Sequence, residues 1–526
     1  MNFLDYAVVL IYILGFLYLG RLFKNNSSGE DYFLGNKQFG WFPLTVSTAA
    51  TQLSAISFVS APAFVGWREG GGMKWLTYEF AVPLAMAFLL VYLIPPLFAS
   101  GQISVYGYLE KRFGGSTRRL LSGFFLLSRG FATSVMLYTV ALILSGVMGI
   151  PMTASILVMG VVTLIYSLQG GMKAVVYGDV IQMGVLFLGI LIMLGFGLHL
   201  LGGWGSFLEQ VDTDRLSVVD WGKMGYGAQD DFGFFPMLIG GFFLYASYYG
   251  TDQSQVQRLF SAPDRKTLGK TLLFNGLFRF PVTLIYCIMG LVLGTFALST
   301  PAFAEAIPAA RPDYLVPIFI RDYLPHGVVG LLVVAIFSAA MSSLSSGINS
   351  LSAATVEDFF ASRRKLSTEV YLRYSKYAVG FWGVICVGLA FFTGGIADTV
   401  IEAINKITSV FFGPILATFI AAIGLQRING RAASVGLLAG VAVNVILWLG
   451  VPELFWFWWN AIGAVVTLAV GLTWSLFDAN IATATSATAD DIGESISRED
   501  WRLVMILVVF FVLIVLFSVY FPNFFA

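Results

Sequence analysis

The stretch Ala49-Ala50-Thr51-Gln52-Leu53-Ser54-Ala55-Ile56-Ser57 lies in the middle of an apolar run, residues 41–65, that is long enough to cross a bilayer. Inside a membrane, irregular backbone survives only where it lines a cavity or a binding site. The small and hydroxylated residues around Gln52, followed by Pro62, therefore predict a broken membrane helix whose free carbonyls face an ion. The alternative is an intact helix whose hydroxyls bond back to their own backbone.

The composition of the whole chain is that of a membrane protein. Of 526 residues, 58% are hydrophobic and only 11% are charged, whereas soluble globular chains carry about 25% charged residues. Lysine plus arginine number 30 and aspartate plus glutamate number 30, so there is no basic excess that would favour nucleic acid. We therefore expect an all-α polytopic membrane protein, and neither a soluble enzyme nor a nucleic-acid binder.

Apolar windows of about 20 residues predict about fourteen transmembrane helices. The windows are residues 4–22, 41–65, 76–99, 120–148, 151–169, 178–201, 233–249, 269–297, 327–356, 376–397, 401–425, 432–450, 454–476 and 502–521. Most lysines and arginines fall in loops that share one side of the membrane, and that side is normally cytoplasmic. This distribution predicts a multi-pass protein of the cell membrane with the N- and C-termini outside.

A few charged residues fall inside the predicted spans. They are Arg129, Arg279, Lys406, Glu79 and Asp179. A charge at the centre of a bilayer costs at least about 2.5–3.5 kcal/mol on insertion scales, so each is a candidate for a functional site. The simpler explanation is a side chain that reaches the interface from near a helix end.

Two further spans are unusually rich in glycine, serine or threonine. One contains residues 240–250, and polar breaks at matching places in two halves of a transporter point to its substrate site. The other, residues 338–346, places small and hydroxylated side chains on one helical face, namely Ala339, Ser342, Ser343 and Ser346. Neutral oxygens beside free carbonyls suit Na⁺, whereas Ca²⁺ would recruit several carboxylates. The alternative is close helix packing through small residues.

The sequence contains no pattern typical of an enzyme or of a cofactor site. Its two cysteines and two histidines are too widely separated to make a structural zinc site. No GxxxxGK[ST] phosphate-binding loop is present, and no nucleophile–base pair emerges. From these residues we expect a bound Na⁺ and no organic cofactor.

Several blocks of residues, in a fixed order, resemble the sodium/solute symporter family, which includes sodium–galactose and sodium–sialic acid symporters. The blocks are Ala50-Thr51-Gln52-Leu53-Ser54, Gly170-Gly171-Met172-Lys173-Ala174-Val175 with Asp179-Val180-Ile181-Gln182, Gly250-Thr251-Asp252-Gln253 with Gln257-Arg258, the serine helix, and Asn405-Lys406-Ile407-Thr408-Ser409 before Gly413-Pro414. The resemblance implies a LeuT-like fold of two inverted five-helix repeats with broken helices. It divides the chain into residues 1–40 (first span and cytoplasmic loop), 41–225 (first repeat), 226–430 (second repeat) and 431–526 (three C-terminal spans).

The resemblance also implies ligands for one or two sodium ions. The first set comprises the carbonyls of Ala50, Leu53 and Ala339 and the hydroxyls of Ser342 and Ser343. A possible second set comprises Asp179, Ser345 and Ser346, sharing Ser342. Every position of both sets matches the family pattern.

The solute site implied by the resemblance combines residues from five spans. Glu79 and Arg279 correspond to a glutamate and a basic residue of the sugar transporters, and Tyr248 to their inner-gate tyrosine. The remaining candidates are Gln52, Ser54, Ser57, Tyr245 and Asn405. Several of these differ from the galactose pattern, and Arg279 replaces a lysine.

Two functions are consistent with these residues. The first is sodium-coupled import of a sugar or polyol by alternating access. The second keeps the sodium coupling but carries an organic acid, such as sialic acid or a monocarboxylate, paired with Arg129 or Arg279. A channel or a solute sensor built on the same fold is a more distant possibility. The expected partners are a small polar solute and membrane lipid, with neither nucleic acid nor an obligatory protein partner.

Overall fold

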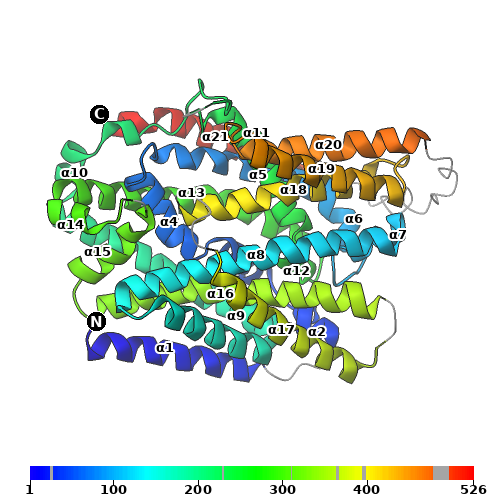
Figure 1. Ribbon diagram of the computed structural model, residues 1–526, viewed down its shortest axis with the longest axis horizontal. Coiled ribbons are helices and arrows are strands. Elements are labelled where there is room, and N and C mark those ends of the chain that lie inside the picture. The colour runs from blue at the N-terminus through cyan, green and yellow to red at the C-terminus, as the bar shows by residue number, and fades with distance from the viewer. Residues whose placement is uncertain are drawn as a thin grey trace.

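The computed structural model describes residues 1–23, 28–227, 230–309, 311–362, 366–393, 399–477 and 497–525. Figure 1 shows them as a bundle of long helices that run side by side, with both chain ends at the same end of the bundle. The described residues form no β-strand, and one isolated bridge joins Tyr226 to Leu454. Lys24 and residues 363–365, which contribute to the predicted basic side, lie outside the described residues.

The described part of the chain is a succession of helices. Their bounds are α1 (Phe3–Leu22), α2 (Gly29–Leu34), α3 (Trp41–Gln52), α4 (Ala55–Gly66), η2 (Met73–Phe80), α5 (Ala81–Phe88), η3 (Leu89–Leu93), α6 (Ile94–Ala99), α7 (Gly107–Phe113), α8 (Gly115–Met148), α9 (Met152–Leu200, kinked at Gly171), α10 (Trp204–Gln210), α11 (Phe234–Thr251), α12 (Gln253–Phe260), α13 (Arg265–Ser299), α14 (Pro301–Ala306), α15 (Leu315–Tyr323), α16 (Val328–Thr355), α17 (Thr368–Ala390), α18 (Val400–Gly424), α19 (Gly430–Gly450), α20 (Phe457–Phe477) and α21 (Arg498–Tyr520).

Fewer helices meet the length and hydropathy expected of a membrane span than the fourteen predicted. Each predicted window overlaps a helix. Among the described residues, however, 10 helices are long and apolar enough to cross a membrane, or up to 11 if the bent pair α3–α4 counts as one span. The count of fourteen and the division into repeats therefore stay predictions, while the all-helical membrane architecture is confirmed.

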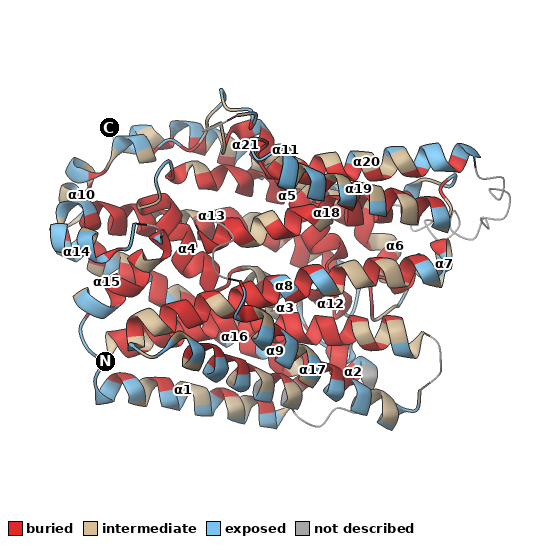
Figure 2. Cartoon of the chain, in the orientation of Figure 1, coloured by how far each residue is buried: buried red, intermediate tan, exposed pale blue. Residues whose placement is uncertain are grey.

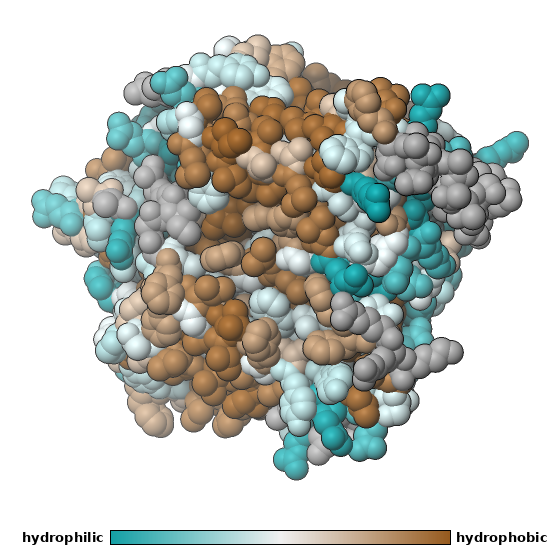
Figure 3. All heavy atoms as spheres, turned by 45° about the vertical axis from the view of Figure 1, so that its right-hand side comes forward, coloured by the Kyte–Doolittle hydropathy of each residue, from teal (hydrophilic) through white to brown (hydrophobic). Residues whose placement is uncertain are grey.

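The helices form an inner group and an outer group. The apolar window of the span that contains α16 is 89% buried and that of α18 is 83% buried, against 22% for α1 and 17% for α21. Figure 2 shows the same gradient, with buried residues concentrated in the middle of the bundle. In Figure 3 apolar side chains gather over the middle of one face and hydrophilic ones lie mostly toward its margins. An apolar outer surface is what a lipid-facing helix bundle requires.

The predicted break in the second span is confirmed. Helices α3 and α4 meet at an angle of 55°, and Leu53 and Ser54 between them have non-helical backbone angles. The Ser54 hydroxyl accepts a hydrogen bond of 3.1 Å from the Ile56 amide and so caps the start of α4. The unwound residues therefore lie in the interior of the bundle, where α4 is buried along its whole length.

The predicted break in the seventh span is wrong in its position. Residues 240–250 lie within α11, which is continuous, and the interruption comes at Asp252, where α12 begins. The glycines serve close packing instead, because a Cβ atom on Gly240 would lie 2.3 Å from the carbonyl oxygen of Phe457, and one on Gly250 would lie 2.4 Å from Leu93. Asp252 ends α11 because its carboxylate caps the first turn of α12 through the Ser254 amide at 2.8 Å.

Glycine also sets the contact between α4 and α13. A Cβ atom on Gly290 would lie 2.7 Å from the backbone of Pro62, and one on Gly66 would lie 2.0 Å from the carbonyl oxygen of Gly290. Small residues at such crossings let two membrane helices approach closely. Because α4 carries one wall of the cavity described below, this contact also positions the site.

We expect Gly290→Ala to lower the thermal stability of the purified protein by several degrees, because overpacking a tight contact costs about 1–3 kcal/mol. The matched control is Gly184→Ala in α9, where nothing lies within 4 Å of the added carbon. Alanine is the better helix former, so the control should be as stable as the parent protein or slightly more stable. Thermal unfolding in detergent measures both, and equal melting temperatures would contradict the packing argument.

Candidate functional site

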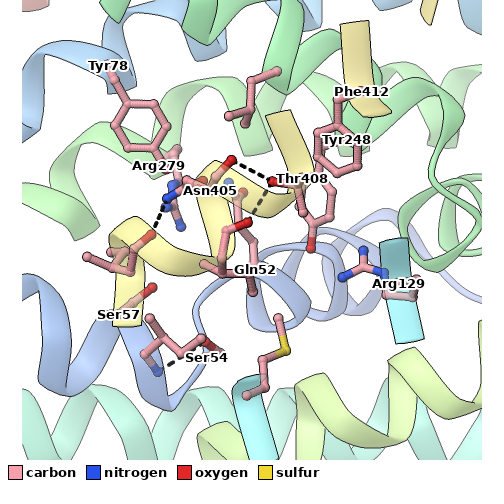
Figure 4. A pocket seen from close by; sticks show the side chains of 15 residues that line it. Gln52, Ser54, Ser57, Tyr78, Arg129, Tyr248, Arg279, Asn405, Thr408 and Phe412 are labelled. Atoms are coloured by element: carbon pink, nitrogen blue, oxygen red, sulfur yellow. Dashed lines mark hydrogen bonds between the residues drawn. The ribbon is translucent and has the colours of Figure 1, made fainter. Parts of the chain in front are cut away.

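A cavity of about 80 Å³ lies in the interior beside the broken helix. Its wall combines the α3–α4 break, η2, α8, α11, α13 and α18. The lining residues are Gln52, Ser54, Ile56, Ser57, Tyr78, Arg129, Met136, Leu244, Tyr248, Arg279, Ile401, Ile404, Asn405, Thr408 and Phe412. Figure 4 shows Arg279 and Arg129 on opposite sides of this group, with Tyr248 next to Arg129. Among the described residues that line the cavity, none is acidic.

The cavity contains six of the eight residues predicted to bind solute. Gln52, Ser54, Ser57, Tyr248, Arg279 and Asn405 line it. The other two, Glu79 and Tyr245, are fully buried behind the wall, and the Tyr245 hydroxyl donates a 2.9 Å hydrogen bond to the Glu79 carboxylate.

Glu79 serves as the counter-ion of Arg279. The Arg279 guanidinium donates to both Glu79 oxygens at 2.9–3.1 Å, and the Thr283 hydroxyl adds a bond of 3.1 Å. The carboxylate is 0% exposed. This bidentate geometry fixes the guanidinium plane. One nitrogen, Nη1 of Arg279, has no hydrogen-bond partner among the described residues.

A second buried ion pair holds Arg129 at the cavity. Its guanidinium lies 2.8 Å from the Asp252 carboxylate and 5.2 Å from the centre of the Tyr248 ring. Tyr248 in turn stacks on Phe412, with ring centres 6.0 Å apart. Nε of Arg129 is the second buried guanidinium nitrogen of the cavity wall without a partner in the described part of the chain.

The residues predicted to bind the first sodium lie where α3 ends against α16. Ala50, Leu53, Ala339, Ser342 and Ser343 are all at most 3% exposed. The Ser343 hydroxyl donates a hydrogen bond of 3.2 Å to the carbonyl of Thr51, which connects the serine helix directly to the break. The structure thus brings neutral hydroxyls next to the carbonyls of an interrupted helix. Their role as sodium ligands stays a prediction.

The residues predicted to bind a second sodium surround Asp179. The Ser342 hydroxyl donates to its carboxylate at 2.5 Å, and the Ser47 hydroxyl donates to the other carboxylate oxygen. Ser346 donates to the carbonyl of Ser342 at 2.6 Å, and Ser345 to the same carbonyl at 3.1 Å. All four predicted side chains therefore belong to one buried cluster.

Arg258 also lies in this cluster, and the sequence did not single it out as a site residue. Its guanidinium is 1% exposed, lies 3.0 Å from the Asp179 carboxylate and donates to Ser346 and Ser47. A guanidinium thus neutralises the one carboxylate of the second set. The sequence feature that could have identified Arg258 is the polar run 252–258, which is too hydrophilic for a lipid-facing helix. In the structure this run forms α12, in which every residue is buried.

The sequence matches the model of the sodium:solute symporter family over residues 32–440. The human sodium/iodide cotransporter is 29% identical over 451 residues, which is 85% of this chain and 69% of the relative. Sodium-coupled monocarboxylate transporter 2 of Bos taurus is 29% identical over 460 residues, 86% of this chain and 71% of the relative. Sodium-coupled monocarboxylate transporter 1 of Mus musculus is 30% identical over 435 residues, with 81% and 68% covered.

Solved structures show the same fold. A substrate-bound, outward-open Na⁺-coupled sialic acid symporter superposes with a TM-score of 0.82 at 24% identity, covering 91% of this chain and 98% of that one. A nucleobase-cation-symport-1 family transporter in a closed conformation gives a TM-score of 0.56 at 13% identity, covering 87% and 97%. The expected LeuT-like fold is confirmed. Because the family match spans most of the chain, this protein is a multi-pass, Na⁺-coupled transporter and not an enzyme, and it belongs to the sodium:solute symporter family.

Proposed function

We propose that the solute of this symporter is a small organic acid, carried as its monocarboxylate anion. The observation that carries the proposal is the polar wall of the cavity, which has two guanidinium groups and no acidic side chain among the described lining residues. Each guanidinium keeps one buried N–H nitrogen without a partner among the described residues. A buried donor without a partner costs about 1–3 kcal/mol, and more when it is charged. A carboxylate in the cavity would place an acceptor beside one of these two guanidinium groups.

The size of the cavity favours a solute with few atoms. A dry cavity of about 150 Å³ admits one benzene molecule in a well-studied case, and this cavity measures about 80 Å³. By the same comparison this volume corresponds to roughly three non-hydrogen atoms, so it favours the smallest acids. The apolar side of the wall, with Ile401, Ile404 and Met136, suits a short hydrocarbon tail. The names of the monocarboxylate and iodide relatives are consistent with a small anion.

A sugar or polyol is the second candidate. Amide and hydroxyl groups from Gln52, Ser54, Ser57 and Asn405 line the same cavity, and such groups hydrogen-bond neutral solutes well. The sugar hypothesis, however, assigned solute contacts to Glu79, whose carboxylate is engaged by Arg279, Tyr245 and Thr283. We therefore rank the acid first.

Uptake into proteoliposomes distinguishes the two candidates. We expect an inward Na⁺ gradient, but not a K⁺ gradient, to drive accumulation of one or more short acids such as acetate, propionate, lactate or pyruvate. Labelled sugars should not accumulate. With the same number of sodium ions, a monocarboxylate carries one charge fewer than a neutral sugar, so the charge moved per solute is an independent measurement. Sodium-driven accumulation of a sugar but of none of the acids would overturn the proposal.

The first sodium site has its own test in Ser343→Ala. Removing one neutral ligand from a bound cation costs about 1.5 kcal/mol, so the sodium concentration for half-maximal uptake should rise about tenfold. Ser352→Ala is a matched control, because Ser352 lies on the same helix, is equally buried and bonds its own backbone at Ile348. An unchanged sodium dependence in Ser343→Ala would contradict the site.

A further inference from the structure

A second pocket, separate from the solute cavity, lies between the N-terminal ends of two membrane-spanning helices, α13 and α21. It has a volume of about 740 Å³. Its lining residues are Arg265, Lys266, Gly269, Lys270, Leu273, Phe274, Ser497, Glu499, Asp500 and Leu503. It shares no lining residue with the solute cavity.

The two helices are joined at one side of this pocket. Gly269 lets α21 approach closely, since a Cβ atom there would lie 3.2 Å from Leu503. Arg265 forms an ion pair with Asp500 at 3.0 Å. Asp500 also accepts hydrogen bonds from Ser497 and completes the cap of α21. Arg265 and Asp500 therefore hold the pocket together, and their charges largely compensate each other.

Two further basic side chains, Lys266 and Lys270, line the pocket from α13. Lys266 and Lys270 are four residues apart, so they lie one helical turn apart on the same face. Among the described residues neither ammonium group has a carboxylate within the 4.0 Å of an ion pair. The N-terminus of the 35-residue helix α13 adds positive potential at the same place. This combination suits a phosphate group.

Apolar side chains continue from the lysines along α13. Leu273 and Phe274 line the pocket. Phe274 stacks on Trp41 at 4.5 Å between ring centres and on Phe278 at 5.8 Å. Phe278 is 54% exposed on the lipid-facing surface. A free phosphate ion would use the lysines but not this strip, whereas an acyl chain would cover it.

We propose that this pocket binds an anionic glycerophospholipid, with its phosphate at Lys266 and Lys270 and an acyl chain along Leu273, Phe274 and Phe278. Both helices begin their membrane span here, which puts the pocket at head-group depth, and basic pockets between such helices are typical sites for anionic lipids. Glu499 and Ser497 at the rim suit a head group that carries hydroxyls, as phosphatidylglycerol does.

Native mass spectrometry and nanodisc competition test the proposal on the full-length protein. In mixed phosphatidylglycerol and phosphatidylcholine, we expect the parent protein to retain phosphatidylglycerol preferentially. Lys266→Gln/Lys270→Gln should reduce that retention at least fivefold. The control Lys111→Gln/Lys376→Gln removes the same charge from two exposed lysines outside the pocket and should retain lipid as the parent does. A second variant, Phe278→Ser, should weaken retention without changing charge.

Three results would overturn the lipid site. They are equal retention of the two lipids by the parent protein, equal loss in the pocket and control variants, and displacement of the lipid by millimolar inorganic phosphate. The last would identify a free-anion site. Size-exclusion profiles verify that each variant is folded, and sodium-driven uptake measured in parallel keeps this outcome separate from that of the transport proposal.

Discussion

Arg279→Gln is expected to lower the uptake efficiency for the transported acid at least a hundredfold. The substitution removes the guanidinium that we assign to the solute carboxylate, and truncating one partner of a buried charge pair costs about 2–5 kcal/mol. It also leaves the Glu79 carboxylate, which is 0% exposed, without its counter-ion. Initial rates of sodium-driven uptake across a range of solute concentrations measure the effect.

The folding contribution of Arg279 can be separated from its role in transport. In Glu79→Gln/Arg279→Gln both charges are removed, so thermal stability should recover while uptake stays low. Arg321→Gln is the matched control, because Arg321 forms an exposed pair with Asp322 and should not affect transport. If the double variant transports the acid normally, Arg279 does not bind the solute.

Glu79→Gln alone then distinguishes the two candidate solutes. It keeps the positive charge of Arg279 and removes the compensating negative charge, so binding of an acid should persist or improve. Binding of a polyol should weaken in the same variant if Glu79 contributes acceptors to it. A strong loss of acid uptake in a well-folded Glu79→Gln protein would favour the polyol instead.

Asp179→Asn is expected to cause the largest loss of stability. The Asp179 carboxylate and the Arg258 guanidinium are both 1% exposed and lie 3.0 Å apart. Removing one partner of such a buried pair costs about 3–5 kcal/mol, because the remaining charge is left without compensation. Thermal unfolding of the purified protein should show a decrease of many degrees or a failure to accumulate in the membrane.

The double variant Asp179→Asn/Arg258→Met tests this explanation. Removing both charges should recover most of the stability, because a buried ion pair can be replaced by apolar groups at little cost. If Asp179 also binds a second sodium, the sodium dependence of uptake in the recovered protein should become less cooperative. Absence of recovery in the double variant would show that Asp179 does not depend on Arg258 as its counter-ion.

Much of the fold was accessible from the amino-acid sequence because a bilayer imposes strong rules on a chain. Apolar length predicts a helix, and a polar interruption inside it predicts a cavity. Both rules held for the stretch around Gln52, where the helix breaks at Leu53 and Ser54. The same reasoning misplaced the second break, since composition cannot distinguish glycines that unwind a helix from glycines that accommodate a neighbour. Gly240 and Gly250 belong to the second kind.

The sequence did not predict which buried charged side chains pair with each other. The sequence identified Glu79, Arg279, Arg129 and Asp179 as unusual because each is expensive in a membrane. It did not predict the three buried ion pairs, which are Glu79 with Arg279, Asp252 with Arg129, and Asp179 with Arg258. These partners are 200, 123 and 79 residues apart along the chain.

The amino-acid order alone is therefore sufficient for the membrane class and the broken helix, because these depend on hydrophobicity and local backbone chemistry, and for the family, because its motif blocks occur in order along the chain. The chemical character of the cavity depends on how the helices pack. Packing decides which charges neutralise each other behind the wall and which charged side chains line the cavity. In this protein the Glu79 carboxylate is paired with Arg279 behind the wall while Arg279 lines the cavity, and for this reason we propose an acid ahead of a sugar as the solute.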